Sequence, residues 1–166
     1  MKISLIGFGY WGKNWARLLA NNHKVEFVSI ADKDACKEIN AIDKYPKTLF
    51  HKNIDKVLKE KPDAVIISTP VSTHYNLSKL FLENGISVLC EKPLSEHPSE
   101  IEELIDIVKK KDVTLMVGHI FEYNKAVQKI KTLLDERYLG DVLYVVSSRC
   151  GLGPMRKDVN VISDLA

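Results

Sequence analysis

The chain has 166 residues and a formal net charge of +2, which suits one domain and gives no indication of binding to nucleic acid or to an anionic membrane surface. Its hydrophobic fraction of 45% and charged fraction of 28% are typical of a globular protein. The three cysteines, Cys36, Cys90 and Cys150, are far apart and have no C-x-x-C spacing, so we expect no disulfide framework, no metal site and a reducing, cytoplasmic location.

The first residues predict a strand rather than a targeting segment. The N-terminus enters an apolar run directly, without the charged and apolar regions of a signal peptide. No apolar run approaches the ~18 residues that a membrane-spanning helix needs, so we expect no association with a membrane.

Residues 3–12 predict a short apolar strand, a glycine-rich turn and the first turn of a helix. Gly7, Gly9 and Gly12 have the G-x-G-x-x-G spacing of a dinucleotide-binding loop. In such a loop the first glycine permits the tight turn, the second lets backbone approach a pyrophosphate, and the third lets the helix pack closely on the sheet. The helix directs free N–H groups and the positive end of its dipole toward the phosphates. A strand–glycine–helix corner can also be purely structural, so the motif needs a second signal.

An acidic residue at the end of the next expected strand supplies that signal. The strand at residues 25–31 ends at Asp32, about 20 residues after Gly12, where the fingerprint places a carboxylate that binds the adenosine ribose. Together the two signals favour a cofactor site over a structural corner. Because a carboxylate would repel a 2′-phosphate, Asp32 favours NAD, whereas the neighbouring Lys33 leaves NADP possible.

Strands and helices alternate regularly through the following residues. The apolar run at residues 64–68 is typical of a strand that helices cover on both faces. Further strands are expected at residues 47–50, 86–90 and 113–117. Helices are expected near residues 33–40, 54–61, 74–84, 101–108 and 123–134. Ser72 or Thr73 is the expected N-cap of the helix at residues 74–84. This alternation predicts an α/β fold with a doubly wound parallel sheet of the Rossmann type.

The pattern changes near residue 140, where residues 141–149 predict a long strand that no helix follows. We therefore expect a dinucleotide-binding Rossmann domain at residues 1–120. Residues 121–166 would form a linking helix and the first strand of an incomplete second, α+β domain. An unpaired strand of this length presents an open edge, which favours pairing with another copy of the chain and hence a homo-oligomer.

Two further strand ends carry polar residues suited to a ligand site, because ligands of an open parallel sheet lie beyond the carboxyl ends of its strands. One is Ser-Thr-Pro at residues 68–70, followed by His74, and the other is Glu-Lys-Pro at residues 91–93. Lys92 could polarise a carbonyl or stabilise the alkoxide formed during hydride transfer. It could also be a surface charge before a proline, but its place after a buried-looking strand favours the catalytic interpretation.

These motifs resemble the glucose–fructose oxidoreductase and inositol 2-dehydrogenase family, known as Gfo/Idh/MocA. The resemblance extends over essentially the whole chain and is carried by G-F-G-Y-W-G-K-N at residues 7–14, S-T-P at 68–70 with Thr73 and His74, E-K-P-L at 91–94, and Gly118 and His119 with Tyr123 and Asn124. It implies that the backbone N–H groups of Tyr10 and Trp11 bind the pyrophosphate.

The same resemblance implies roles at the other strand ends. Thr69, Pro70 and His74 would line the path from adenosine to nicotinamide. Glu91 and Lys92 would lie beside the nicotinamide, with Lys92 as the active-site lysine and a cis bond to the following proline. The residues expected to bind the cofactor are Gly7, Phe8, Gly9, Tyr10, Trp11, Gly12, Asp32, Lys33, Ser68, Thr69, Pro70, His74, Glu91, Lys92 and His119.

The last residues resemble a subgroup associated with sugar-nucleotide oxidation, which includes UDP-N-acetylglucosaminuronate 3-dehydrogenases. Arg149 and residues 151–153 and 158–161 carry this resemblance. Asp164 falls where the family begins an Asp-x-x-x-His signature, whose histidine is the usual proton-transfer partner of the lysine. That histidine would lie two positions beyond Ala166, so we expect the chain to be truncated before it.

The resemblance therefore implies an NAD(P)-dependent oxidoreductase that acts on a secondary alcohol of a sugar or nucleotide sugar by hydride transfer, with turnover impaired in this chain. Two alternatives stay open. One is a non-catalytic NAD-binding module or fragment, and the other is a structural α/β domain that binds no ligand.

Overall fold

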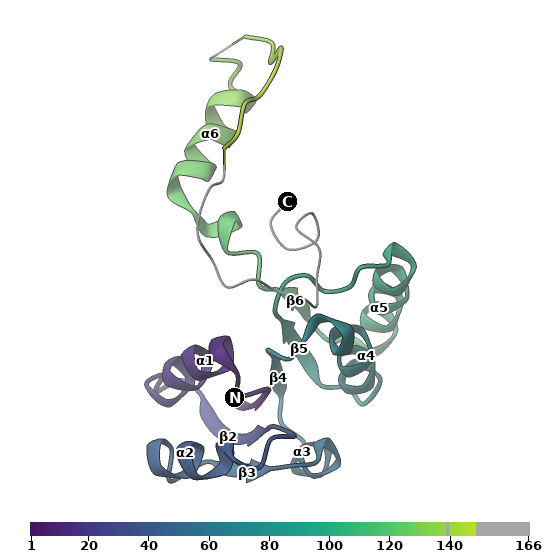
Figure 1. Cartoon of the computed structure of the whole chain (residues 1–166). Helices are drawn as coiled ribbons and strands as arrows, with labels where there is room; N and C mark the ends of the chain where they lie inside the picture. The colour runs from purple at the N-terminus through teal and green to yellow at the C-terminus, as the bar shows by residue number, and fades with distance from the viewer. Residues whose placement is uncertain (139, 149–166) are drawn as a thin grey trace. The chain divides into compact units, whose positions relative to one another are not determined.

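A computed structural model describes residues 1–138 and 140–148, which separate into two compact units. The first unit covers Met1–Gly118 and the second begins at His119. All strands of the described residues belong to the first unit (Figure 1).

In the described part of the chain, six parallel strands form one sheet in the order β3-β2-β1-β4-β5-β6. The strands are β1 (Lys2–Ile6), β2 (Glu26–Ala31), β3 (Leu49–His51), β4 (Ala64–Ile67), β5 (Ser87–Cys90) and β6 (Leu115–Val117). The order reverses between β1 and β4, because the chain first adds strands on one side of β1 and then on the other. This is the doubly wound arrangement of a Rossmann fold, so the predicted fold class is confirmed.

Helices cover both faces of this sheet (Figure 1). They are α1 (Tyr10–Ala20), α2 (Lys37–Lys44), α3 (Ile54–Glu60), α4 (His74–Glu83) and α5 (Pro98–Lys111). Ala16 of α1 and Leu5 of β1 share one apolar cluster with residues of α2. Phe81 of α4 and Ile6 of β1 share the other cluster with residues of α3 and α5. Successive strand side chains point to opposite faces, and residues 3–6 of β1 are all buried, so both faces of this strand are covered.

The helix predicted near residues 33–40 begins later, at Lys37, as α2. Asp32 Oδ1 accepts a hydrogen bond from the backbone N–H of Asp34 at 2.9 Å, and Asp34 Oδ1 accepts one from that of Cys36 at 3.0 Å. Such side-chain-to-backbone bonds compete with the helical pattern, which explains why the helix begins only after this turn.

Thr73 is the N-cap of α4 as expected, but its side chain makes no capping hydrogen bond. Residues Val71–Thr73 form a 3₁₀ turn, η1, and α4 begins at His74 with Thr73 as its N-cap. The hydroxyl of Thr73 donates to the carbonyl oxygen of Pro70 at 2.7 Å and does not cap the first turn of α4.

The second unit contains η2 (Ile120–Tyr123) and α6 (Lys125–Asp135). The side-chain oxygen of Asn124 caps α6 by accepting hydrogen bonds from the backbone N–H groups of Ala126 at 2.9 Å and Val127 at 3.2 Å. No helix among the residues described is both long and apolar enough to cross a membrane.

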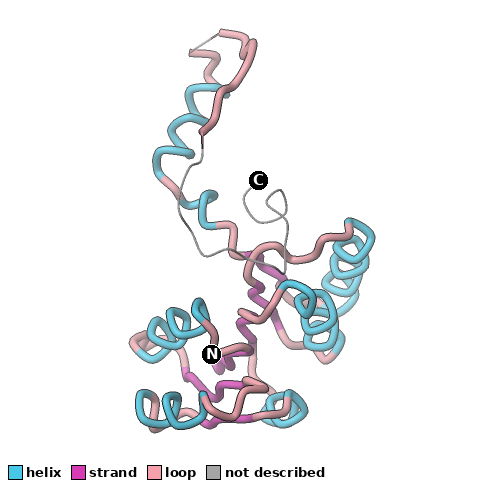
Figure 2. The backbone as a smooth tube through the Cα atoms, in the orientation of Figure 1, coloured by secondary structure: helices cyan, strands magenta, loops and turns pink. Residues whose placement is uncertain are grey.

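The strand predicted over residues 141–149 is not formed in its described part. Residues 141–148 are loop (Figure 2), and no strand pairing of the described residues involves them. An alternating sequence becomes a strand only when a neighbouring strand satisfies its backbone groups, so the sequence pattern alone was not sufficient here. Residue 149 lies outside the described residues, as do the tail segments that carry the resemblance to sugar-nucleotide enzymes.

Candidate functional site

The loop between β1 and α1 has three glycines with different surroundings. Gly7 has a φ of +94°, and a Cβ there would lie 2.6 Å from the carbonyl oxygen of Ser68. A Cβ on Gly12 would lie 2.1 Å from the carbonyl oxygen of Gly7. A Cβ on Gly9, in contrast, would meet no atom of the described residues within 4 Å. The fold therefore requires Gly7 and Gly12, whereas Gly9 borders open space that a ligand can approach.

The N-terminus of α1 carries backbone N–H groups that no side chain of the described residues caps. Gly9, at the N-cap, has no side chain, and the first turn contains no acidic residue. The first N–H groups of a helix have no acceptor within the helix, and the helix dipole places partial positive charge on them. This end of α1 therefore fits an anionic group such as a phosphate.

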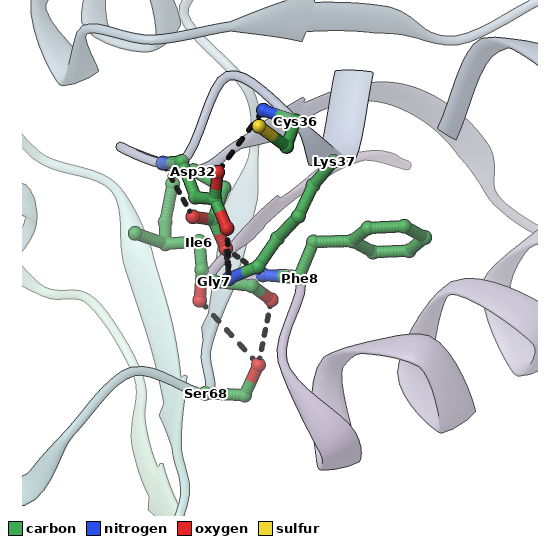
Figure 3. A network of polar contacts seen from close by, with 8 residues as sticks. Ile6, Gly7, Phe8, Asp32, Cys36, Lys37 and Ser68 are labelled. Atoms are coloured by element: carbon green, nitrogen blue, oxygen red, sulfur yellow. Dashed lines mark hydrogen bonds and ion pairs between the residues drawn. The ribbon is translucent and has the colours of Figure 1, made fainter. Parts of the chain in front are cut away.

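Asp32 lies at the end of β2, next to the glycine loop (Figure 3). Its Oδ2 accepts a hydrogen bond from the backbone N–H of Phe8 at 2.7 Å and one from Nζ of Lys37 at 2.9 Å. Burial raises the pKa of Asp32, but the hydrogen bonds from Asp34, Phe8 and Lys37 together outweigh burial and hold this pKa below its ordinary value of 3.8. A carboxylate offers about four acceptor sites, and the described residues use three of them, which leaves one for a ribose hydroxyl as far as the described chain shows.

Ser68 follows β4 and supports the glycine loop from the neighbouring strand. Its hydroxyl donates to the carbonyl oxygen of Gly7 at 2.9 Å (Figure 3). Its backbone N–H donates to the carbonyl oxygen of Ile6 at 2.8 Å. The hydroxyl is thus engaged with the loop, and the expected contact of Ser68 with a cofactor stays a prediction.

His74 connects the segments that follow β4 and β5. It is buried, and its Nε2 lies 2.8 Å from the carbonyl oxygen of Thr69 while its Nδ1 lies 2.7 Å from that of Pro93. Both ring nitrogens are therefore engaged with backbone, so His74 holds the two segments together. The expectation that Thr69 and Pro70 line the path of a cofactor stays a prediction.

Glu91 and Lys92 follow β5 at the same edge of the sheet. The carboxylate of Glu91 accepts a hydrogen bond at 2.8 Å from the indole N–H of Trp15 in α1. Lys92 is half-buried, and its peptide bond to Pro93 is cis, which confirms the geometry that the resemblance implied. Because all six described strands are parallel, their carboxyl ends bring the start of α1, Asp32 and Lys92 to one edge.

The remaining residues that the sequence analysis named are Lys33, His119 and the cysteines. Lys33 is exposed beside Asp32, and His119 belongs to the second unit, so its expected contact with the cofactor stays a prediction. Among the described residues, no group of three or more His, Cys, Asp or Glu side chains could hold a metal ion. Burial raises the pKa of the Cys90 thiol to about 12, so this cysteine is an unreactive core residue.

The sequence analysis missed two residues of the site. Trp15 lies four positions after Trp11, at the spacing of an apolar helix face, but its indole N–H is a donor that needs an acceptor when it is partly buried. Lys37, whose Nζ lies 2.9 Å from Asp32 Oδ2, matched a polar helix and gave no signal of its own. A pairing of this kind depends on how the turn after β2 folds.

Comparison with known proteins agrees with this geometry. Residues 1–119 match the GFO_IDH_MocA family model, described as an oxidoreductase family with an NAD-binding Rossmann fold. An uncharacterised oxidoreductase of Streptococcus pneumoniae is 30% identical over 152 residues, which are 91% of this chain and 41% of that protein. UDP-N-acetylglucosamine 3-dehydrogenase of Acidithiobacillus ferrooxidans is 27% identical over 166 residues, which are 99% of this chain and 50% of that protein.

The fold is also similar to that of a solved structure. The crystal structure of myo-inositol 2-dehydrogenase from Lactobacillus plantarum has a TM-score of 0.77 and 24% identity over 87% of this chain and 43% of its own. The chain thus spans half or less of the length of these three proteins. The matched family model covers the glycine loop, Asp32 and Lys92, and the chain belongs to the Gfo/Idh/MocA family of oxidoreductases with an NAD-binding Rossmann fold.

Proposed function

We propose that this chain is the cofactor-binding part of an NAD-dependent oxidoreductase that oxidises a secondary alcohol of a sugar or nucleotide sugar. The observation that carries the proposal is that three features lie at one edge of the sheet: the N-terminus of α1, the carboxylate of Asp32, and Lys92 in the segment after β5. Membership of an oxidoreductase family supports the reaction class. The relative named UDP-N-acetylglucosamine 3-dehydrogenase supports a nucleotide sugar as substrate.

The position of Asp32 determines the direction in which we place the dinucleotide. β2 lies on one side of β1, and β4 and β5 lie on the other. With the adenosine ribose at Asp32 and the pyrophosphate at the N-terminus of α1, the nicotinamide half extends over the ends of β4 and β5, toward Lys92. A bound nicotinamide cofactor supplies the hydride acceptor. Lys92 holds the substrate hydroxyl and stabilises the negative charge that develops on its oxygen.

We propose NAD as the preferred cofactor over NADP. The lowered pKa of Asp32 keeps its side chain ionised near neutral pH, and a carboxylate next to the ribose repels a 2′-phosphate. Lys37, which pairs with Asp32, and the exposed Lys33 reduce this repulsion. NADP should therefore bind more weakly than NAD, without being excluded.

Calorimetric titration of the chain with NAD and with NADP tests whether it binds the cofactor. The same titration of Gly9→Ala tests whether the pyrophosphate lies at the glycine loop. The added methyl group meets no described protein atom, so the free energy of unfolding should fall by less than about 1 kcal/mol. The same methyl group occupies the place of closest approach to the pyrophosphate, so NAD affinity should fall by at least about tenfold. Absence of binding to the wild type would refute the proposal, and unchanged affinity in Gly9→Ala would refute the placement of the phosphates.

Turnover is tested separately, by following NADH formation with a panel of UDP-sugars and inositols. Because we propose this chain as the cofactor-binding part of the enzyme, we expect at most a low rate with substrates of this class, and loss of that rate in Lys92→Met with NAD binding retained. Tight NAD binding without activity toward any member of the panel would support the alternative, a non-catalytic NAD-binding module.

A further inference from the structure

One hydrogen bond joins the helix that begins at the proposed phosphate site to the strand end that carries Lys92. The indole N–H of Trp15, in α1, donates to Oε1 of Glu91 at 2.8 Å, across 76 positions of sequence. Glu91 is itself fixed at the end of β5, because its backbone N–H donates to the carbonyl oxygen of Ile67 at 2.9 Å. The hydrogen bond therefore fixes the distance between α1 and the residue that precedes Lys92.

The second carboxylate oxygen of Glu91 lies next to Gly118. A Cβ on Gly118 would lie 3.3 Å from Glu91 Oε2, so glycine at this position leaves room for the carboxylate. The backbone N–H of Gly118 donates to the carbonyl oxygen of Cys90 at 2.8 Å, which keeps residue 118 next to the end of β5. The carboxylate of Glu91 thus lies between the indole of Trp15 in α1 and Gly118, which follows β6.

The two tryptophans of α1 differ in their surroundings, although both match the same apolar pattern. Trp11 is 54% exposed and contacts Tyr10 edge to face, with ring centroids 5.9 Å apart. Trp15 is half-buried and directs its N–H at a carboxylate. A hydrogen bond to a charged acceptor is stronger than one between neutral groups, so Trp15 can restrict where Glu91 lies.

We propose that Trp15 is a positioning residue that fixes the carboxylate of Glu91 at the nicotinamide end of the site, where this charge favours binding of NAD⁺ over NADH. The inference rests on the proposed function, because it uses the placement of the nicotinamide over the ends of β4 and β5. The oxidised ring carries a positive charge and the reduced ring is neutral, whereas the adenosine and pyrophosphate are the same in both. A fixed carboxylate near the ring therefore changes the ratio of the two affinities, and contacts with the rest of the cofactor do not.

The test is calorimetric titration of Trp15→Phe with NAD⁺ and with NADH. Phenylalanine keeps an apolar ring and removes the N–H donor, so the preference for NAD⁺ should fall by about fivefold, the order of one partly exposed charge interaction. Glu91→Gln keeps an acceptor oxygen but removes the charge and should lower the preference to a similar extent. The double variant should show no further fall, because both substitutions remove the same interaction.

Tyr75→Phe is the matched control, since it also removes one hydrogen bond to a carboxylate. The Tyr75 hydroxyl donates to Glu103, which joins α4 and α5 rather than the site, so the ratio of affinities should not change. The indole ¹⁵N–¹H resonances give a second readout that does not depend on the folding of Trp15→Phe. The resonance of Trp15 should shift in Glu91→Gln, and that of Trp11, the other tryptophan of the chain, should stay in place.

The outcomes separate this inference from the proposed function. If the wild type binds neither form of the cofactor, the proposed function fails. If NAD⁺ binds tightly but the ratio of the affinities for NAD⁺ and NADH is the same in the wild type, Trp15→Phe and Glu91→Gln, only the inference about Trp15 fails. The inference would also be overturned if Trp15→Phe weakened the binding of NAD⁺ and of NADH equally. The same holds if the indole resonance of Trp15 did not shift in Glu91→Gln.

Discussion

The carboxylate of Asp32 accepts hydrogen bonds from three segments: the glycine loop, the turn after β2 and the start of α2. The sequence analysis assigned it one partner, the adenosine ribose. The structure adds that Asp32 also holds the loop in place through Phe8. Its substitution should therefore affect both folding and cofactor binding, so the two effects must be measured separately.

We expect the contribution of Asp32 to folding to depend on pH. Its pKa in the folded chain lies below the ordinary value of 3.8, so the ionised form is favoured by folding. That contribution is fully present above the unfolded-state pKa, about pH 4, and is lost as the pH falls through the folded-state pKa. The difference in urea midpoint between the wild type and Asp32→Asn should be constant between about pH 7 and about pH 5 and should shrink below about pH 4. A difference that persists unchanged at lower pH would show that the hydrogen bonds to Asp32 do not favour its ionised form.

At the scale of elements, the site depends on links between strand ends that are far apart in the sequence. His74, the first residue of α4, bonds the carbonyl oxygens of Thr69 and Pro93. Trp15 bonds α1 to Glu91. Each of these side chains fixes a segment that follows one strand relative to another element, and such links give a rigid edge on which Lys92 can be placed.

We expect His74→Phe to destabilise the first unit by about 1–3 kcal/mol, because a backbone carbonyl oxygen would lose the N–H donor of this buried ring. Denaturant unfolding measures this loss, and an unchanged m-value would show that the unfolded state is not altered. His23→Phe, at an exposed position before β2, is the control and should change the free energy of unfolding by less than about 0.5 kcal/mol. A similarly small change in His74→Phe would contradict the role assigned to these two hydrogen bonds.

At the scale of the whole molecule, the second unit carries a run of exposed apolar side chains. Val142, Leu143, Tyr144, Val145 and Val146 are each more than half exposed, as is Ile130 of α6. Contiguous exposed apolar residues commonly mark an interaction surface.

We propose that residues 142–146 take part in self-association, and light scattering at several concentrations checks this. The wild type should form dimers or larger species. Leu143→Lys combined with Val145→Lys should shift it toward monomer, because lysine opposes edge-to-edge pairing of segments. A wild type that stays monomeric at every concentration would contradict the proposal.

Some features of this protein followed from local sequence patterns. The alternation of apolar runs with helical periodicity predicted the α/β class, and the positions of Gly7, Gly9, Gly12 and Asp32 indicated a dinucleotide site. These signals work because a strand, a tight turn or a helix start is specified by residues close together in the chain. The boundaries were less accurate, as in α2, because the hydrogen bonds of Asp32 and Asp34 delay the start of that helix.

The sequence by itself determined the succession of strands and helices from β1 to α6, the glycine loop and the acidic residue that follows it. Only the tertiary structure decided that Gly7 and Gly12 are enclosed while Gly9 borders open space, that both nitrogens of His74 are engaged with backbone, and that Trp15 bonds Glu91. It also decided that residues 141–148 form no strand in the described chain. The physical reason is the same in each case, because such contacts join residues far apart in sequence, and their partners are settled only when the sheet assembles.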